Sequence, residues 1–142
     1  MTATSQSLPD YHHYLDNFSV HSVIARLDDH RDGLLNAFEA CCGRHVRAGR
    51  GDVLALVQED SQGDMHTLSY AELDEQSAKL AGWFQSQGLG IGDRIACMLP
   101  RSPQLLIAVL ATWRIGAVYQ PLFTAFGPDA VDYRLGRADT KL

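Results

Sequence analysis

The sequence predicts an α/β fold: part of a doubly wound, mostly parallel sheet with flanking helices. Two observations carry this prediction. From residue 53 onward the chain reads as strand, strand, helix, strand, helix, strand, helix, and repeated strand–helix–strand units imply parallel strands joined by right-handed crossovers. The run 95–99 is apolar at every position, as expected for a strand that is covered on both faces.

The composition excludes several classes of protein. The 142 residues are 46% hydrophobic and 20% charged, which is typical of a globular chain and excludes a largely disordered one. The net charge is −5 and the basic residues are dispersed, so we expect no nucleic-acid partner. The sequence shows no polybasic amphipathic segment, no secretory signal and no apolar run long enough for a bilayer. We therefore expect a cytoplasmic protein without a membrane partner.

The beginning of the chain shows little periodicity. Residues 1–17 are polar and are interrupted by Pro9, so we expect a flexible arm there. The tyrosine and histidine tract 11–14 lacks further ligands at a useful spacing, and solvated or packed side chains are expected rather than a metal site. Residues 18–27 carry one apolar helical face, and 28–33 form a turn.

A clearer helix is expected over 34–46. Its apolar residues recur at steps of three and four, which predicts one buried stripe. The stripe consists of Leu34, Leu35, Phe38, Cys41, Cys42 and His45. The three cysteines of the chain, Cys41, Cys42 and Cys97, are odd in number and include an adjacent pair. This argues against a disulfide framework and favours buried, reduced thiols.

A β-hairpin and a capped helix follow. Residues 53–57 and 65–68 read as two strands, joined by the turn-forming residues 61–64. Ser69 and Glu72 fit a capping box, in which each side chain bonds the backbone NH of the other residue. The inner face of this helix is expected to consist of Leu73, Ser77, Leu80, Ala81 and Phe84.

The glycine-rich segment 88–93 is not interpreted as a phosphate-binding loop. It follows a helix and precedes a strand, the reverse of the order in a dinucleotide-binding fingerprint. We expect Gly88 to end the helix and Gly92 to form a turn into the sheet. The elements expected next are a strand at 95–99, a buried helix at 103–115, a strand at 117–120, a helix from 128 onward and a turn at 138–142 that leads toward a further strand.

Five segments between residues 67 and 127 resemble, in order and spacing, the N-terminal motifs of adenylate-forming enzymes. They are 67–73 (TLSYAEL), Gly88 with 92–96 (GDRIA), 99–103 (LPRSP), 115–118 (IGAV) and 121–123 (PLF). Each segment is weak by itself, and the five in register make a chance match unlikely. The resemblance extends over residues 34–142.

Further segments narrow the resemblance to AMP-forming acyl-CoA synthetases of the acetate type. They are 98–103, 121–127, Leu35-Asn36 and Arg44-His45. In that group an aspartate commonly precedes the Arg-His pair, whereas Gly43 stands here, which we interpret as a local difference in capping or packing. Short-chain and medium-chain acids are the substrates that this resemblance implies.

The resemblance implies that residues 18–142 are the N-terminal portion of an AMP-binding synthetase domain, truncated at its C-terminal end. Enzymes of this family use ATP and Mg²⁺ to convert a carboxylic acid to an acyl-adenylate, and the thiol of coenzyme A then displaces AMP. By the resemblance, the phosphate-binding loop and the catalytic lysine lie beyond Leu142, so we expect no catalytic residue within the chain. We expect its partner to be the missing C-terminal remainder. The 142 residues alone are expected to bind none of the cofactors tightly and to have no ligase activity.

One ligand contact is implied by the same resemblance. The loop formed by Phe123, Thr124 and Ala125 corresponds to the loop that lies beside the adenine of coenzyme A in acetate-type relatives. An aromatic face with small neighbours suits a flat base. The alternative, which we favour for the chain in isolation, is that Phe123 and Phe126 only pack the edge of the sheet.

Other interpretations remain open. The chain could belong to another adenylate-forming enzyme, such as a peptide-synthetase adenylation domain, or it could be a stand-alone interaction domain without catalytic function. An unrelated nucleotide-binding α/β domain is disfavoured because no strand, glycine-rich loop and helix occur in succession. A sheet that stops after residue 142 would leave an open edge, so we also expect self-association.

Overall fold

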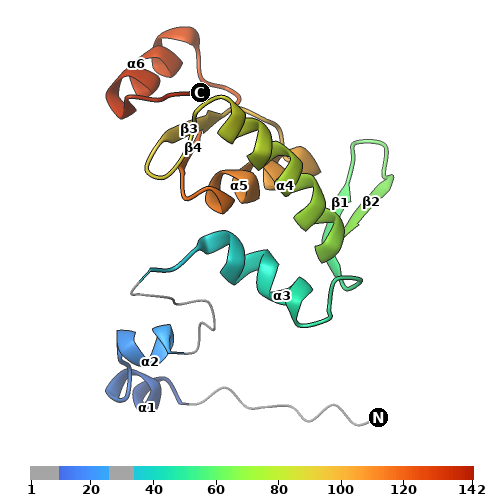
Figure 1. The fold of residues 1–142 in the computed structure, drawn as a ribbon, viewed down its shortest axis with the longest axis vertical. Helices are drawn as coiled ribbons and strands as arrows, with labels where there is room; N and C mark the ends of the chain where they lie inside the picture. Colours follow the sequence, from blue (N-terminus) through green and yellow to red (C-terminus); the bar gives the residue numbers. More distant parts are fainter. Residues whose placement is uncertain (1–9, 26–33) are drawn as a thin grey trace.

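The computed structural model describes residues 10–25 and 34–142 (Figure 1). The turn expected at 28–33, residues 1–9 of the expected arm and the end of the helix expected over 18–27 lie outside the described residues. In chain order the elements are α1 (Tyr11–Asp16), α2 (Val20–Ile24), the π-helix η1 (Glu39–Gly43), α3 (Arg44–Arg47), β1 (Leu54–Glu59), β2 (Met65–Ser69), α4 (Tyr70–Ser86), β3 (Arg94–Cys97), α5 (Pro103–Arg114), β4 (Val118–Pro121) and α6 (Pro128–Ala138). Across the two described ranges, no helix is both long and apolar enough to cross a membrane.

The centre of the fold is a parallel pair of strands, β3 and β4, with Arg94 opposite Val118. Side chains alternate across a strand, so Arg94 and Ile95 face opposite sides. Ile95 packs with buried residues of α4 and α5, whereas Arg94 Nε donates to the carbonyl of Ala138 in α6 at 2.8 Å. Helices therefore lie on both faces of this pair, with α6 above it and α4 and α5 below it in Figure 1. The predicted α/β class and the parallel pairing are confirmed.

The strands β1 and β2 form a separate antiparallel hairpin rather than further strands of the parallel sheet. The predicted hairpin is thus confirmed. Ala55 and Leu56 of β1 and Leu68 of β2 pack against a buried cluster contributed by the 38–42 segment, α4 and α5. The cluster consists of Phe38, Cys42, Leu73, Ile107 and Leu110.

Helix α4 begins with the predicted capping box. The Oγ of Ser69 accepts from the NH of Glu72 at 3.2 Å, and Glu72 Oε2 accepts from the NH of Ser69 at 2.7 Å. The bond from the backbone of Ser69 is the main reason that the pKa of Glu72 lies below its ordinary value. Gly88 follows the helix with φ +82°, a left-handed conformation that favours glycine at a helix end. The predicted inner face is buried at Leu73, Ser77, Ala81 and Phe84, with Leu80 half-buried beside them.

The helix predicted over 34–46 starts later and contains the π-helical turn η1. Gly43 is buried within that turn, and a Cβ at this position would lie 2.5 Å from Glu39 Oε2. The carboxylate of Glu39 pairs with the guanidinium of Arg47. Gly43 therefore leaves room for the Glu39 carboxylate beside the Arg-His pair, which is a packing difference of the kind that the sequence suggested.

The buried stripe predicted for this helix is correct only in part. Phe38 and Cys42 are each 1% exposed, but Leu34 and Leu35 are exposed because they precede the first helical turn. Cys41 is also exposed, because the wider π turn changes the spacing of the residues that face the core. The prediction of a buried thiol is therefore wrong for Cys41. It is confirmed for Cys42, and Cys97 is half-buried. His45 packs on the ring of Tyr70, with centroids 4.4 Å apart.

Arg114, at the end of α5, joins the 38–42 segment to α4. Its guanidinium lies 3.7 Å from the centroid of the Phe38 ring and pairs with the carboxylate of Asp74. Its Nη2 also donates to the carbonyl of Asp74 at 3.0 Å. Burial, followed by the negative charge of Asp74, raises the pKa of the Cys42 thiol to about 11. This thiol is therefore protonated at neutral pH.

The short helices α1 and α2 contribute no buried residue. Asp10 accepts from the NH of His12 at 3.4 Å, and Ser19 accepts from the NH of Ser22 at 3.1 Å. Helix α1 lies in a segment where the sequence predicted no regular structure. A search for an apolar stripe misses this helix, because a helix of six residues is too short to show one. Only the side-chain caps mark such short helices.

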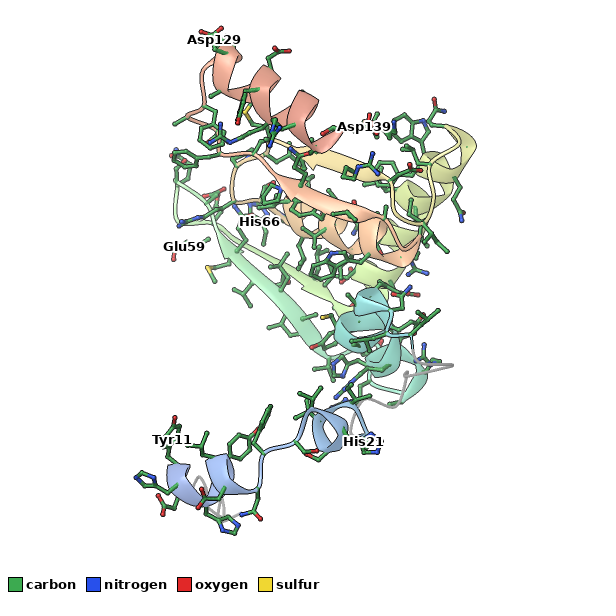
Figure 2. The ribbon with its side chains drawn as sticks, turned by 90° about the vertical axis from the view of Figure 1, so that its left-hand side faces the viewer. Tyr11, His21, Glu59, His66, Asp129 and Asp139 are labelled. Carbon is green, nitrogen blue, oxygen red and sulfur yellow. The ribbon has the colours of Figure 1, made fainter. Side chains whose placement is uncertain are left out.

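The end of the described chain bonds the edge of β3 that lies opposite β4. The NH of Lys141 donates to the carbonyl of Arg94 at 2.9 Å, and the NH of Ala96 donates to the carbonyl of Leu142 at 2.7 Å. The predicted turn toward a further strand is present, with Asp139 in the left-handed conformation at φ 50°. Figure 2 shows Asp139 where α6 returns to the strands, and Asp129 at the far end of that helix.

Candidate functional site

The loop between β4 and α6 holds the three residues that the sequence singled out. Leu122, which starts the loop, is 8% exposed, and its NH donates to the carbonyl of Cys97 at 2.9 Å. A tight turn follows, closed by a bond of 3.0 Å from the NH of Phe126 to the carbonyl of Phe123. The loop is thus tied to the carboxyl ends of both parallel strands, the location where open α/β sheets bind their ligands.

A cavity of about 460 Å³ opens beside this loop. It lies at the carboxyl ends of β3 and β4 and against the first turns of α5. Its lining includes Cys97, Leu105, Tyr119, Phe123, Phe126 and Arg134. The volume is within the range of small-molecule sites, and the lining is mainly aromatic and apolar with few polar groups, as is typical of such sites.

The two aromatic rings of the loop contact each other, and one cation contacts the second ring. Phe123 and Phe126 meet edge to face, with centroids 5.8 Å apart and planes at 82°. The guanidinium of Arg134 lies 4.0 Å from the centroid of the Phe126 ring. Phe123 is 64% exposed, so one face of its ring is open to solvent. An open aromatic ring backed by a second ring is suited to stacking against a flat base.

Tyr119 and Cys97 form the floor of the cavity on the α5 side. Burial, followed by hydrogen bonding to the Cys97 thiol, raises the pKa of Tyr119 to about 12. Its hydroxyl is therefore neutral at physiological pH and can act as a hydrogen-bond donor or acceptor. Of the residues that line the cavity, Arg134 alone carries a permanent charge.

The structure brings only part of the predicted site to the cavity. Phe123 lines it, whereas Thr124 and Ala125 lie exposed at the tip of the turn. Sequence reasoning did not find Arg134 or Tyr119. The available signals were the position of Tyr119 two residues before the end of a strand and the place of Arg134 in the second turn of the following helix.

Several residues that carry the family resemblance are structural rather than ligand-binding. Gly92 adopts φ +82°, and its NH donates to the carbonyl of Gly116 at 3.0 Å. Asp93 Oδ2 accepts from the NH of Gly90 at 2.8 Å. Arg94 Nη2 donates to the carbonyl of Asp139 at 2.7 Å, and its Nε bonds the preceding carbonyl of α6. The Gly-Asp-Arg step thus fixes the turn into β3 and fastens α6 to it.

A family model for AMP-binding enzymes matches residues 43–142. The chain belongs to the AMP-binding enzyme family. Among curated relatives, it is 41% identical over 112 residues to the acetyl-coenzyme A synthetase of Streptomyces avermitilis, 39% identical to that of Streptomyces coelicolor and 36% identical to that of Caulobacter vibrioides. These alignments cover 78–79% of the chain but only 17% of each relative.

A solved structure gives the same assignment. The crystal structure of an acyl-CoA synthetase from Brucella canis superposes with a TM-score of 0.87 at 35% sequence identity. The superposition covers 94% of this chain and 24% of that protein. The fold described above therefore corresponds to about a quarter of that synthetase, and the predicted resemblance to acyl-CoA synthetases is confirmed.

Proposed function

We propose that the chain forms the N-terminal part of an AMP-forming acyl-CoA synthetase of the acetate type, acting on a short-chain or medium-chain acid in the cytoplasm. The observation that carries the proposal is the 36–41% identity to three acetyl-coenzyme A synthetases together with the match to the AMP-binding family. In the proposed reaction a carboxylate oxygen attacks the α-phosphorus of ATP and releases pyrophosphate. The thiolate of coenzyme A then attacks the acyl carbon of the adenylate and releases AMP.

In this reaction we expect the chain to contribute a binding surface for coenzyme A and structural support, and no catalytic residue. It holds two lysines, Lys79 and Lys141. Lys79 pairs with Glu75 on the surface of α4, and Lys141 bonds Asp139. Both lysines are thus used in structural contacts, and neither lines the cavity beside the loop. ATP and Mg²⁺ would accordingly be held by other parts of the synthetase, and we expect the 142 residues alone to form no acyl-CoA.

The cavity fits one end of coenzyme A. Phe123 presents an open ring at the carboxyl ends of the strands, and Phe126 supports that ring from behind. Stacking of the adenine on Phe123 is worth about 1–3 kcal/mol by analogy with other base–aromatic contacts. Thr124 and Ala125 would face the sugar or solvent, since they lie at the exposed tip of the turn.

A chimeric synthetase tests the proposal. Residues 34–142 replace the corresponding segment of the Streptomyces avermitilis enzyme, and formation of acetyl-CoA is measured together with ATP–pyrophosphate exchange. We expect both activities in the chimera and neither in the 142-residue chain. A folded chimera, as judged by circular dichroism and thermal unfolding, that catalyses neither reaction would contradict the assignment to acetate-type synthetases.

Phe123→Ala in the same chimera tests the coenzyme A contact. The expected result is a rise of about tenfold in the apparent KM for coenzyme A with unchanged pyrophosphate exchange, since only the second half-reaction uses coenzyme A. Thr124→Ser is the control, because it keeps a small hydroxyl residue at the tip of the turn. An unchanged KM in Phe123→Ala would leave packing of the sheet edge as the role of this ring.

A further inference from the structure

We propose that Arg134 is a positioning residue for coenzyme A: it holds Phe126 against Phe123 and so fixes the ring on which the adenine stacks. This inference rests on the proposed function, because it needs the loop to be the adenine site. The inference goes beyond the proposed function because it assigns a role to a residue of α6, which lies outside the loop.

Arg134 is itself held in place. Its Nη1 donates to the carbonyl of Ala130 at 2.9 Å, one turn earlier in α6. The carbonyl of Arg134 accepts from Gln120 Nε2 at 3.1 Å, which ties this point of the helix to β4. Gln120 in turn accepts from the hydroxyl of Thr140 at 2.6 Å. The guanidinium therefore projects from a part of α6 that is fastened to the sheet.

The guanidinium of Arg134 lies over the ring of Phe126, which stands behind the ring that is open to solvent. It lies 4.0 Å from the centroid of Phe126, well within the distance at which a cation is attracted to the face of an aromatic ring. Phe126 meets Phe123 edge to face at 5.8 Å. Contacts thus run from the sheet through Arg134 and Phe126 to Phe123, and the exposed ring is the last member of the series.

The backbone of the loop does little to fix the orientation of these rings. A single backbone bond closes the turn from Phe123 to Phe126, and the residues between them are exposed. Ring orientation therefore depends on side-chain contacts. An aromatic ring that is ordered before binding loses less conformational entropy when a base stacks on it, so removal of the support is expected to weaken binding without changing the chemistry.

A second arginine of α6, Arg137, provides a matched control for substitutions of Arg134. Arg137 is exposed and lies one turn further along α6. Arg134→Met keeps an unbranched, apolar stem and removes the charge, and Arg134→Lys keeps a cation that can approach the ring. Arg137→Met removes an equivalent charge elsewhere on the helix.

The first experiment uses the 142-residue chain with labelled aromatic side chains. Nuclear Overhauser effects between the rings of Phe123 and Phe126 are expected in the wild type, in Arg134→Lys and in Arg137→Met, and are expected to be lost in Arg134→Met. Methyl signals of the core, recorded in the same samples, establish that each variant is folded. Ring contacts that persist in a folded Arg134→Met, or that are absent from the wild type, would overturn the proposal.

The second experiment measures kinetics in the chimeric synthetase. Arg134→Met is expected to raise the apparent KM for coenzyme A about three- to tenfold, with kcat within about twofold and pyrophosphate exchange unchanged. The factor is expected to be the same for 3′-dephospho-coenzyme A, because the arginine acts through the ring. A loss confined to coenzyme A would instead indicate a direct ionic contact with the 3′-phosphate, which overturns the positioning role.

Comparison of Phe123→Ala with Arg134→Met in the chimeric synthetase separates failure of this inference from failure of the proposed function. If Phe123→Ala leaves the KM for coenzyme A unchanged, the loop is not the adenine site and the proposed contact fails first. If Phe123→Ala raises that KM but Arg134→Met does not, the site stands and the role of Arg134 is wrong.

Discussion

Phe38 offers a direct test of how the N-terminal helical segment is attached. Its side chain is 1% exposed and contacts Leu73 of α4 and residues of α5, with the Arg114 guanidinium over its ring at 3.7 Å. Truncation of a buried phenylalanine to alanine costs about 3–5 kcal/mol, and the lost cation–π contact adds about 0.5–1 kcal/mol. We therefore expect Phe38→Ala to lower the free energy of unfolding by about 4 kcal/mol, a large part of the stability of a single domain.

Urea denaturation followed by tryptophan fluorescence measures this loss. With an m value of about 2 kcal/mol/M, a change of 4 kcal/mol corresponds to a shift of about 2 M in the midpoint. Leu35→Ala is the matched control, since this residue is 50% exposed and is expected to cost less than about 0.5 kcal/mol. A loss below about 1 kcal/mol in Phe38→Ala would refute the reasoning, because it would mean that this segment is not packed on α4 and α5 in solution.

Three further outcomes are expected. Ser69→Ala removes the cap of α4 and should lower the free energy of unfolding by about 1 kcal/mol in urea titrations, with Ser86→Ala at the other end of the helix as the comparison. Asp139 has a pKa below its ordinary value of 3.8, chiefly because Lys141 bonds its carboxylate. Such a group stabilises the fold above the ordinary value and loses this effect as the pH falls through the folded-state pKa. Asp139→Asn should therefore destabilise the chain at pH 6, and the difference from the wild type should shrink as the pH is lowered below 3.8. Exposed apolar side chains such as Val118 beside the outer edge of β4 should promote self-association, and a monomer in sedimentation equilibrium at high concentration would contradict this.

Elements that are specified by local chemistry could be read from the sequence. The capping box at Ser69 and Glu72 requires only two side chains at a fixed spacing, and the structure has both of its bonds. The apolar run that contains Ile95 predicted a strand covered on two faces, and helices lie on both sides of it. The turns predicted at Gly88 and Gly92 are also confirmed, because both glycines adopt positive φ values that other residues avoid.

Features that depend on tertiary packing could not be read in the same way. The π turn arises where Gly43 and Glu39 meet, and the spacing of apolar residues does not report it. Its presence moved Cys41 out of the predicted stripe. At the candidate site, the sequence pointed to the loop at Phe123 but not to Arg134, because the contact between Arg134 and Phe126 exists only once α6 has folded back over the sheet.

The bonds that Lys141 and Leu142 make with β3 show where successive strand connections change direction across the sheet. From β3 the chain passes through α5 to β4 on one side, and from β4 it passes through α6 to the opposite edge of β3. The first parallel strand of the chain is thus the middle one in space. In open α/β sheets a crevice forms where successive connections leave in opposite directions, since neighbouring loops part there. This point falls at the carboxyl end of β3, next to Cys97, so the order of the strands places the crevice at the same end of the sheet as the loop that carries Phe123.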